Sequence, residues 1–443
     1  MKRRIVALLT ALCILSALLS GCTDRSALRA AALTKVNYPV CVKAPTDPNG
    51  KDFESKVLAH YSDRMNRITL PCQSEGLTDF LRASIPQILG EQAGENCIYS
   101  PLNVYLAMGM LAELTDGETR QEILDVMGCA DLESLRTQAG NLWLSNYNDD
   151  GVSTRRLGSS LWLSDQYSFH QETLDVLAEH YYATAYRGTM GSADLNQALR
   201  DWLNQQTGNF LSEQVSDIEL KPGTALALAS TLYYKANWGI EFSEASTRDE
   251  VFHGLEEDLT CAFMHQSLDT NYYWGEHFTA VRMVMEDDSA MWFILPDEDY
   301  TVEDLLQETE TMDFLLAGKS WEDKRTLTVH LSIPKFDVTS QLDLSRSMQQ
   351  LGVTDAFDRL RADFSPTTSD TGLYVSQVRH DARVKIDEEG CEAASYVLML
   401  MDATSAPPPE YDEVDFVLDQ PFLFAIANEQ GLPLFVGTVY TPA

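Results

Sequence analysis

The stretch Pro101–Leu114 is apolar on nearly every side, and it constrains the fold more than any other segment. A helix without a polar face has no side to turn toward water, so it belongs in the interior of a large body. Ser100 and Pro101 are a typical helix start, because serine caps exposed backbone amides and proline fits the first helical position. The sequence therefore predicts a body large enough to surround this helix.

Several segments carry strand patterns. Residues 327–333 alternate apolar and polar side chains up to Pro334, which indicates a half-buried strand. Residues 224–236 are a long strand candidate, and the apolar runs 421–426 and 433–440 predict two buried strands. Because helices and strands do not alternate regularly, the expected class is α+β with several large sheets.

The N-terminus has the parts of an export signal. Three basic residues precede the apolar run 5–19, which is short for a membrane span. Residues 19–22, Leu-Ser-Gly-Cys, resemble the lipobox of bacterial lipoproteins. The resemblance implies a lipid on Cys22 that holds an exported chain on the outer face of a bacterial membrane. A secreted protein without lipid is the alternative.

The chain is expected to have three parts. Residues 1–21 are the signal peptide. Residues 22–75 contain several prolines and one helical stretch near 53–65, which indicates a lipid-anchored tether. Residues 76–443 show no second linker and no internal repeat, so they are expected to form one large domain.

The chain is strongly acidic. Loss of the signal peptide removes three basic residues, so the net charge changes from −35 to −38. This charge argues against nucleic acid and anionic lipid headgroups as partners. It is compatible with attraction to basic proteins, although solubility alone also explains it.

Motifs of catalysis and metal binding are absent. The chain has no G-x-S-x-G, H-E-x-x-H or G-x-G-x-x-G, and Asp313 stands where a phosphate loop ending in Lys319 and Ser320 needs glycine. No cysteine spacing fits zinc or redox chemistry, so mostly buried thiols outside disulfides are expected. These cysteines are Cys41, Cys72, Cys97, Cys129, Cys261 and Cys391. No cofactor and no metal are expected, and an enzyme with an unrecognised site stays an alternative.

The segment 387–415 passes from small residues through an apolar run into prolines and acids, so it fits neither a linker nor a plain strand. Its start, EEGCEAAS, strongly resembles the hinge of the serpin family, Glu-Glu-Gly-Thr-Glu-Ala-Ala-Ala. Further segments resemble the same family, in the family's order. They are NCIYSPLNVYLAMGML, DGETRQEI, SSLWLSD, WLNQQTGNFL, STLYYKANW, CAFMHQ, IPKFDV, LGVTDAFD, ADFSP, LYVSQVRHDARVKIDEEG, PFLFAI and LPLFVGTVYTP.

The resemblance implies a serpin fold, with a large central β-sheet, two further sheets, eight or nine helices and an exposed reactive-centre loop. It also implies a monomer that inhibits serine proteases irreversibly. A protease attacks the loop and forms an acyl-enzyme, and the loop then inserts as a strand into the large sheet before the ester is hydrolysed. The native fold would be a kinetic trap.

The loop sequence fits insertion, because alternate side chains of a strand face opposite ways. One set is small or apolar, and the other holds the charges and a tyrosine. The implied hinge is Glu388, Glu389, Gly390, Cys391, Glu392, Ala393, Ala394 and Ser395. The set expected to be buried is Cys391, Ala393, Ser395, Val397, Met399 and Met401, and the set expected to face outward is Glu392, Ala394, Tyr396, Leu398, Leu400 and Asp402.

Three residues in and after the hinge depart from the family's pattern. Cys391 replaces a threonine of similar size, and Ser395 and Tyr396 stand in the third and fourth places of the alanine run. Tyr396 falls on the outward face, where it should slow insertion. Serpins also cluster two serines, an asparagine and a histidine beneath the opening sheet. The matching residues here are Ser100, Asn103, Ser230 and His380, with serine and asparagine exchanged. We expect either one buried hydrogen-bond network that is kept or a looser sheet.

The family's spacing from Gly390 places the scissile bond at Thr404–Ser405, give or take one residue. Met401 is a further candidate for the residue before the cut, although it would make the loop short. A small uncharged residue before the cut disfavours trypsin-like targets and favours elastase-like or subtilisin-like proteases. Acids beyond the cut could steer a basic protease or simply be solvated. A non-inhibitory serpin that acts as a surface binding module is the alternative function.

Overall fold

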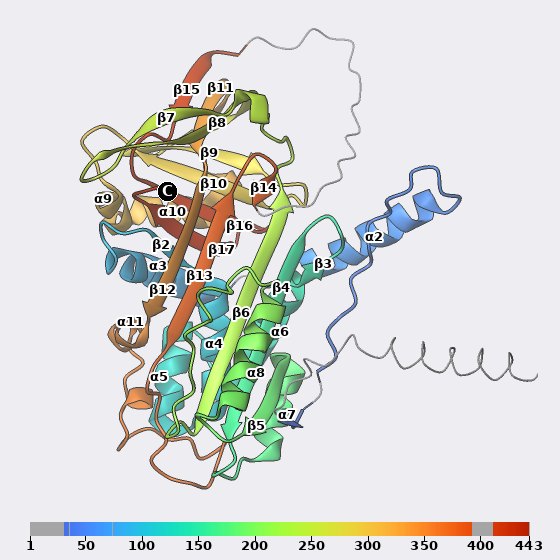
Figure 1. The fold of residues 1–443 in the computed structure, drawn as a ribbon, viewed down its shortest axis with the longest axis vertical. Helices are drawn as coiled ribbons and strands as arrows, with labels where there is room; N and C mark the ends of the chain where they lie inside the picture. The colour runs from blue at the N-terminus through green and yellow to red at the C-terminus, as the bar shows by residue number, and fades with distance from the viewer. Residues whose placement is uncertain (1–30, 35, 73, 392–410, 443) are drawn as a thin grey trace, which may run out of the picture.

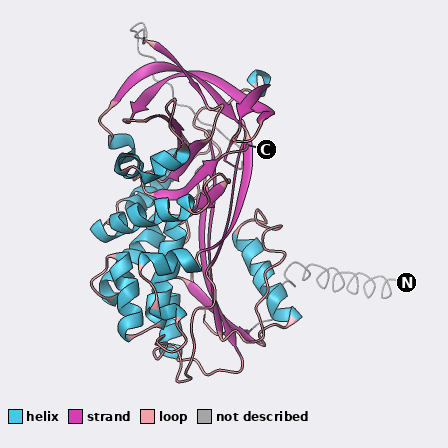
Figure 2. Cartoon of the chain, turned by 90° about the vertical axis from the view of Figure 1, so that its left-hand side faces the viewer, coloured by secondary structure: helices cyan, strands magenta, loops and turns pink. Residues whose placement is uncertain are grey.

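The computed structural model describes residues 31–34, 36–72, 74–391 and 411–442. The described part is α+β, as expected, with most helices packed on one side of the long strands (Figure 2). It holds one or two more α-helices than expected: α2 (Phe53–Ile68), α3 (Glu75–Gly90), α4 (Pro101–Leu114), α5 (Gly117–Met127), α6 (Leu132–Asn146), α7 (Gln171–His180), α8 (Ala193–Gln206), α9 (Val302–Gln307), α10 (Thr309–Ala317) and α11 (Ser345–Leu351). Short 3₁₀ turns are η1 (Glu244–Ser246), η2 (Gly318–Ser320) and η3 (Asp355–Phe357).

The largest sheet has nine strands and fills the upper part of the molecule (Figure 1). Its order is β15 (Glu413–Val417), β11 (Lys324–Pro334), β8 (Asp258–Trp274), β9 (Phe278–Val284), β10 (Ala290–Pro296), β16 (Phe422–Ala427), β17 (Pro433–Val439) and β2 (Cys97–Tyr99), with β7 (Arg248–His253) beside β8. The strands expected at 327–333, 421–426 and 433–440 are confirmed as β11, β16 and β17, within one to three residues at each end.

Two further sheets contain the long strands that run down the body. The six-stranded sheet has the order β1 (Ala31–Ala32), β5 (Ala183–Gly188), β4 (Thr154–Ser164), β6 (Leu226–Asn237) and β14 (Gly390–Cys391), with β3 (Asn148–Asp149) beside β4. The two-stranded sheet pairs β12 (Phe336–Asp343) with β13 (Arg379–Ile386). The long strand expected at 224–236 is β6.

Helix α4 is the interior helix that the sequence predicts. All its residues except Ala107 and Leu111 are buried, and Ser100 is its N-cap with Pro101 following. The one charged side chain, Glu113, is held by two hydrogen bonds from Arg136, at 2.8 and 2.7 Å. This pairing explains how a carboxylate fits into an otherwise apolar helix.

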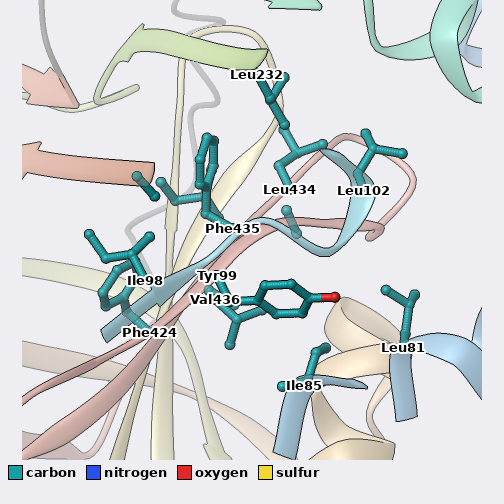
Figure 3. Packing of buried hydrophobic residues seen from close by; sticks show 14 of the residues in the cluster. Leu81, Ile85, Ile98, Tyr99, Leu102, Leu232, Phe424, Leu434, Phe435 and Val436 are labelled. Carbon is teal, nitrogen blue, oxygen red and sulfur yellow. The ribbon is translucent and has the colours of Figure 1, made fainter. Parts of the chain in front are cut away.

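The core continues from α4 toward the nine-stranded sheet. Figure 3 shows Tyr99 on β2 lying among Val436 of β17 and the α3 side chains Leu81 and Ile85. All four side chains are at most 2% exposed. The helices are therefore joined to the nine-stranded sheet by continuous apolar packing.

The N-terminal segment, residues 36–72, is attached to the body. Its helix α2 begins at the predicted position and ends at Ile68, three residues beyond the expected stretch. Arg67 donates to the Tyr147 carbonyl at 2.7 Å, and His60 lies 2.8 Å from Asp150. The part of the expected tether that forms α2 is thus hydrogen-bonded to the body. The boundaries of the tether, residues 22 and 75, stay a prediction.

A buried ion pair joins the six-stranded sheet to the turn between β16 and β17. Arg155 of β4 and Glu429 are 3% and 7% exposed, and Arg155 Nη1 donates to Glu429 Oε2 at 2.7 Å. Burial raises the pKa of Glu429, but the Arg155 guanidinium outweighs it and lowers that pKa overall. Asp287 lies 3.8 Å from Arg155 Nε and adds a second buried carboxylate.

The substitution Arg155→Leu should therefore lower the free energy of unfolding by about 3–5 kcal/mol, because two carboxylates lose their buried cation. The neighbour Arg156, whose side chain is 36% exposed, pairs with Asp149 at 3.3 Å, so Arg156→Leu should change stability by about 1 kcal/mol or less. Urea unfolding followed by tryptophan fluorescence measures both. Equal effects of the two substitutions would contradict the role assigned to the buried pair.

Candidate functional site

Strand β6 has one closed edge and one open edge. On one side it pairs with β4 from Leu226 to Lys235. On the other, its strand neighbour within the described residues is the two-residue β14. Strand β13 pairs with β12 and is not hydrogen-bonded to β6 in this part of the chain. An open edge of this kind can accept a further strand. The sheet that would take up the loop is therefore the six-stranded sheet and not the larger, nine-stranded one.

The predicted hinge begins at this open edge. Gly390 is opposite Asn237 and Cys391 is opposite Ala236, in antiparallel register. A side chain at position 390 would bring a Cβ within 2.5 Å of the Ala236 carbonyl oxygen, so only glycine allows the strands to approach this closely. The chain is therefore already seated as a strand at the top of β6.

The predicted hinge residues Glu388 and Glu389 are fixed from several sides. Glu388 is 9% exposed and accepts hydrogen bonds from Lys335 Nζ at 2.6 Å and Thr247 Oγ1 at 2.7 Å. Burial raises the pKa of Glu388, but the bonds from Lys335 and Thr247 outweigh it and lower the pKa. The Glu389 carbonyl accepts from the Trp238 amide at 3.0 Å. These bonds clamp the start of the loop.

The rest of the predicted loop site lies outside the described residues, as does the predicted lipidation site Cys22. Cys391, the first residue of the set expected to be buried, is 4% exposed. The alternation and the scissile bond stay predictions. The loop positions concerned are Glu392, Ala393, Ala394, Ser395, Thr404 and Ser405.

The four residues of the expected network form two separate hydrogen-bonded pairs. One pair contains Ser100, the N-cap of α4, and the other contains Asn103, about one helical turn further along. The Ser100 amide donates to His380 Nε2 on β13 at 3.1 Å. Asn103 Nδ2 donates to the Ser230 carbonyl on β6 at 3.3 Å, and the Ser230 hydroxyl donates back to Asn103 Oδ1. Each pair ties α4 to one side of the open edge, so the start of α4 bridges β6 and β13.

The sequence did not indicate Lys335, Thr247 and Trp238 as parts of the hinge site. Lys335 and Thr247 are 53 and 141 residues from Glu388, and Trp238 is 149 residues from Asp387, the residue before the hinge. No local spacing could therefore have linked them to the hinge. Lys335 and Trp238 do lie in segments that resemble the family, and this was the available signal.

The cysteines follow the expectation. None of the six described cysteines forms a disulfide, and all but Cys129 and Cys261 are buried. Within the described residues, no cluster of three or more histidine, cysteine or acidic side chains could hold a metal ion.

Comparisons with known proteins agree with this geometry. A family model described as serpin (serine protease inhibitor) matches residues 75–442, so the chain belongs to the serpin family. Serpins typically bind serine proteases, and the chain is thus a protease inhibitor by family rather than an enzyme.

Individual relatives are distant. Plasminogen activator inhibitor 1 of Bos taurus is 26% identical over 385 residues, covering 82% of this chain and 91% of the relative. A serpin-like protein of Thermococcus kodakarensis is 28% identical over 366 residues, covering 80% of this chain and 82% of the relative. The native structure of the thermophilic serpin tengpin has a TM-score of 0.74 at 21% identity, covers 94% of this chain and 100% of that one, and shows the shared fold alone.

Removal of the ammonium partner of Glu388 should loosen the hinge. In Lys335→Met the Glu388 carboxylate loses its cation in a mostly buried place, so the amide of Cys391 should exchange with deuterium about tenfold faster. The matched control is Lys385→Met, because Lys385 is 43% exposed and 3.9 Å from Asp387. Unchanged exchange in Lys335→Met would contradict the clamp.

The His380 pair should make the native state sensitive to acid. Burial lowers the pKa of His380 to about 4, so the neutral ring is favoured in the folded protein. Above about pH 6.5, the pKa of histidine in the unfolded chain, His380 is neutral in both states and costs no stability. As the pH falls from about 6.5 to about 4, the unfolded chain binds the proton more readily, so the free energy of unfolding decreases by up to about 3 kcal/mol.

Unfolding midpoints between pH 7 and pH 4 measure this loss. His380→Gln keeps a side-chain acceptor for the Ser100 amide but has no proton to gain, so its midpoint should fall less steeply. His170→Gln, at an exposed histidine, should follow the unsubstituted protein. Parallel curves for all three proteins would show that His380 does not carry the acid sensitivity.

Proposed function

We propose that this protein is an irreversible suicide-substrate inhibitor of elastase-like or subtilisin-like serine proteases. The observation that carries the proposal is the open edge of β6 with the hinge already paired at its upper end. Glycine at 390 permits the close pairing, and the bonds to Glu388 fix where the loop departs. The segment that leads into the loop is thus already paired with the edge that would accept the loop.

The register at the hinge predicts how much of the loop fits. Each further loop residue advances one position down β6, since the strands are antiparallel. Continuation from Cys391 opposite Ala236 brings Met401 opposite Leu226, which is the first residue of β6. Residues 390–401 would therefore complete the whole twelve-residue strand. The predicted scissile bond follows three residues later.

The proposed chemistry uses the protease's own machinery. Its serine attacks the Thr404 carbonyl carbon, the bond to the Ser405 nitrogen breaks, and Thr404 becomes an ester on the protease. Insertion of the freed loop along β6 would then carry the ester away before water attacks it. Full insertion of a twelve-residue strand moves the end of the loop by roughly 40 Å.

The target class follows from the residue before the cut. Thr404 is small and uncharged, so a pocket that needs a base would not accept it. The acids beyond the cut give weaker guidance, because two of them have partners of their own. Asp412 is 2.9 Å from Arg325, and Glu413 is 3.5 Å from His330. We propose that these two acids hold β15 against β11 through these pairs, and that they do not steer a protease.

The proposed location is the outer face of a bacterial membrane, with a lipid on Cys22. The sequence Leu-Ser-Gly-Cys after a basic and apolar start supports this proposal. No helix among the described residues is long and apolar enough to cross a membrane. The mass of the N-terminal peptide from the native cell would test for the lipid.

The function is tested by mixing the unlipidated chain from residue 23 with an elastase. We expect a complex that survives boiling in detergent and a released peptide that begins at Ser405.

Ala393→Arg should convert the inhibitor into a substrate, because a charge on the inward face blocks burial. Ala394→Arg, on the outward face, is the matched control and should retain the complex.

Cleavage without a stable complex would contradict inhibition and favour the surface binding module.

Thr404→Arg tests the scissile position, since the variant should form the same complex with trypsin. If trypsin cleaves elsewhere, the predicted register of the loop is wrong.

A further inference from the structure

Helix α2 presents apolar side chains to solvent on one face. Val57, Leu58 and Tyr61 are 41%, 67% and 60% exposed, and α2 has no buried residue. Val40, which is 91% exposed, lies in the irregular segment before the helix. Apolar side chains gathered on one face of a projecting helix usually mark a contact surface. We call Val57, Leu58 and Tyr61 the α2 face.

The direction of the α2 face is fixed by polar contacts at the other end of the helix. Arg64 donates to Asp288 at 2.8 Å, and Arg67 donates to the Tyr147 carbonyl at 2.7 Å. Figure 1 shows that α2 is attached at its C-terminal end while its N-terminal half projects from the flank of the body. The projecting half therefore lacks the tertiary packing that usually stabilises a helix of this length.

The N-terminal region differs from the rest of the chain in charge. Residues 22–72 hold eight basic and five acidic side chains, a net of +3. The mature chain has a net charge of −38, so residues 73–443 carry −41. The expectation that anionic lipid repels the protein thus applies to the body and not to this region. Lys43 and Arg64 pair with Asp149 and Asp288 of the body, so the net charge of +3 is partly offset there. An anionic surface would attract residues 22–72 weakly and repel the remainder.

The predicted anchor lies close to this region. Cys22 is nine residues before Ala31, and nine extended residues span at most about 30 Å. Ala31 and Ala32 are fixed to β5 as the edge strand β1. A lipid on Cys22 would therefore keep a membrane surface within a short distance of the flank from which α2 projects.

We propose that the α2 face lies on the lipid surface to which Cys22 is anchored. The apolar face and the basic charge of the region fit the interface of an anionic bilayer, where an amphipathic helix lies flat. The inference rests on the proposed anchor. Lipid and helix would then form two attachment points, so the orientation of the inhibitor on the membrane would be fixed.

A second copy of the chain is a poorer occupant of the α2 face. Three side chains bury much less than the about 800 Å² per partner of a standard protein interface. The basic residues of two N-terminal regions would also approach each other. Lipid needs neither a matching shape nor a large area.

The test couples the mature chain, through its N-terminal Cys22, to a lipid thioester in vesicles of phosphatidylcholine and phosphatidylglycerol. Deuterium exchange of the peptide 53–62 should be about tenfold slower on vesicles than for the same chain in solution. The double variant Leu58→Asp/Tyr61→Asp should exchange on vesicles as fast as in solution. The control Ala59→Asp/Asn66→Asp adds the same charge on the other side of the helix, at two exposed positions, and should stay protected.

Equal exchange on vesicles and in solution would overturn the proposal, as would protection that survives in Leu58→Asp/Tyr61→Asp. Protection that appears in solution as the protein concentration rises would assign the α2 face to a second copy. Because the coupling is chemical, these outcomes do not depend on natural lipidation, which the N-terminal mass tests separately. They are also independent of protease inhibition.

Discussion

The open edge of β6 is the constraint on which the rest of this structure depends. A strand edge without a neighbour is a place where another strand can add, and natural proteins usually cover or shorten such edges. Here the edge is long, and its upper end is occupied by Gly390 and Cys391, the start of the loop that would complete it. Among the described residues, the start of the donor segment is thus in register with the acceptor edge.

The contacts around the edge hold this arrangement in place. The start of α4 binds β6 through Asn103 and β13 through Ser100, so both sides of the opening are tied to one buried helix. Lys335 and Thr247 hold the hinge at Glu388. These are few and specific bonds, whereas insertion would add a whole strand of backbone hydrogen bonds. Under the proposed function, the native state would be a kinetic trap whose lifetime depends on the bonds that hold the opening.

Much of the fold could be predicted from sequence, because its signals are local. The interior position of α4 follows from its uniformly apolar surface, and β6, β11, β16 and β17 follow from their patterns. Contacts between distant residues could not be predicted in this way. The attachment of α2 depends on Arg67 meeting Tyr147, and the hinge depends on Lys335. The resemblance to serpins supplied the four residues under the sheet, but only the structure divides them into two pairs.

The structure of the protein after cleavage at Thr404 tests the central claim most directly. If the loop is built to fill the edge, residues 390–401 should form a strand between β6 and β13, with Met401 opposite Leu226 and the thermal unfolding midpoint raised. A cleaved loop that stays outside the sheet, with β6 and β13 still apart and the midpoint unchanged, would contradict the account.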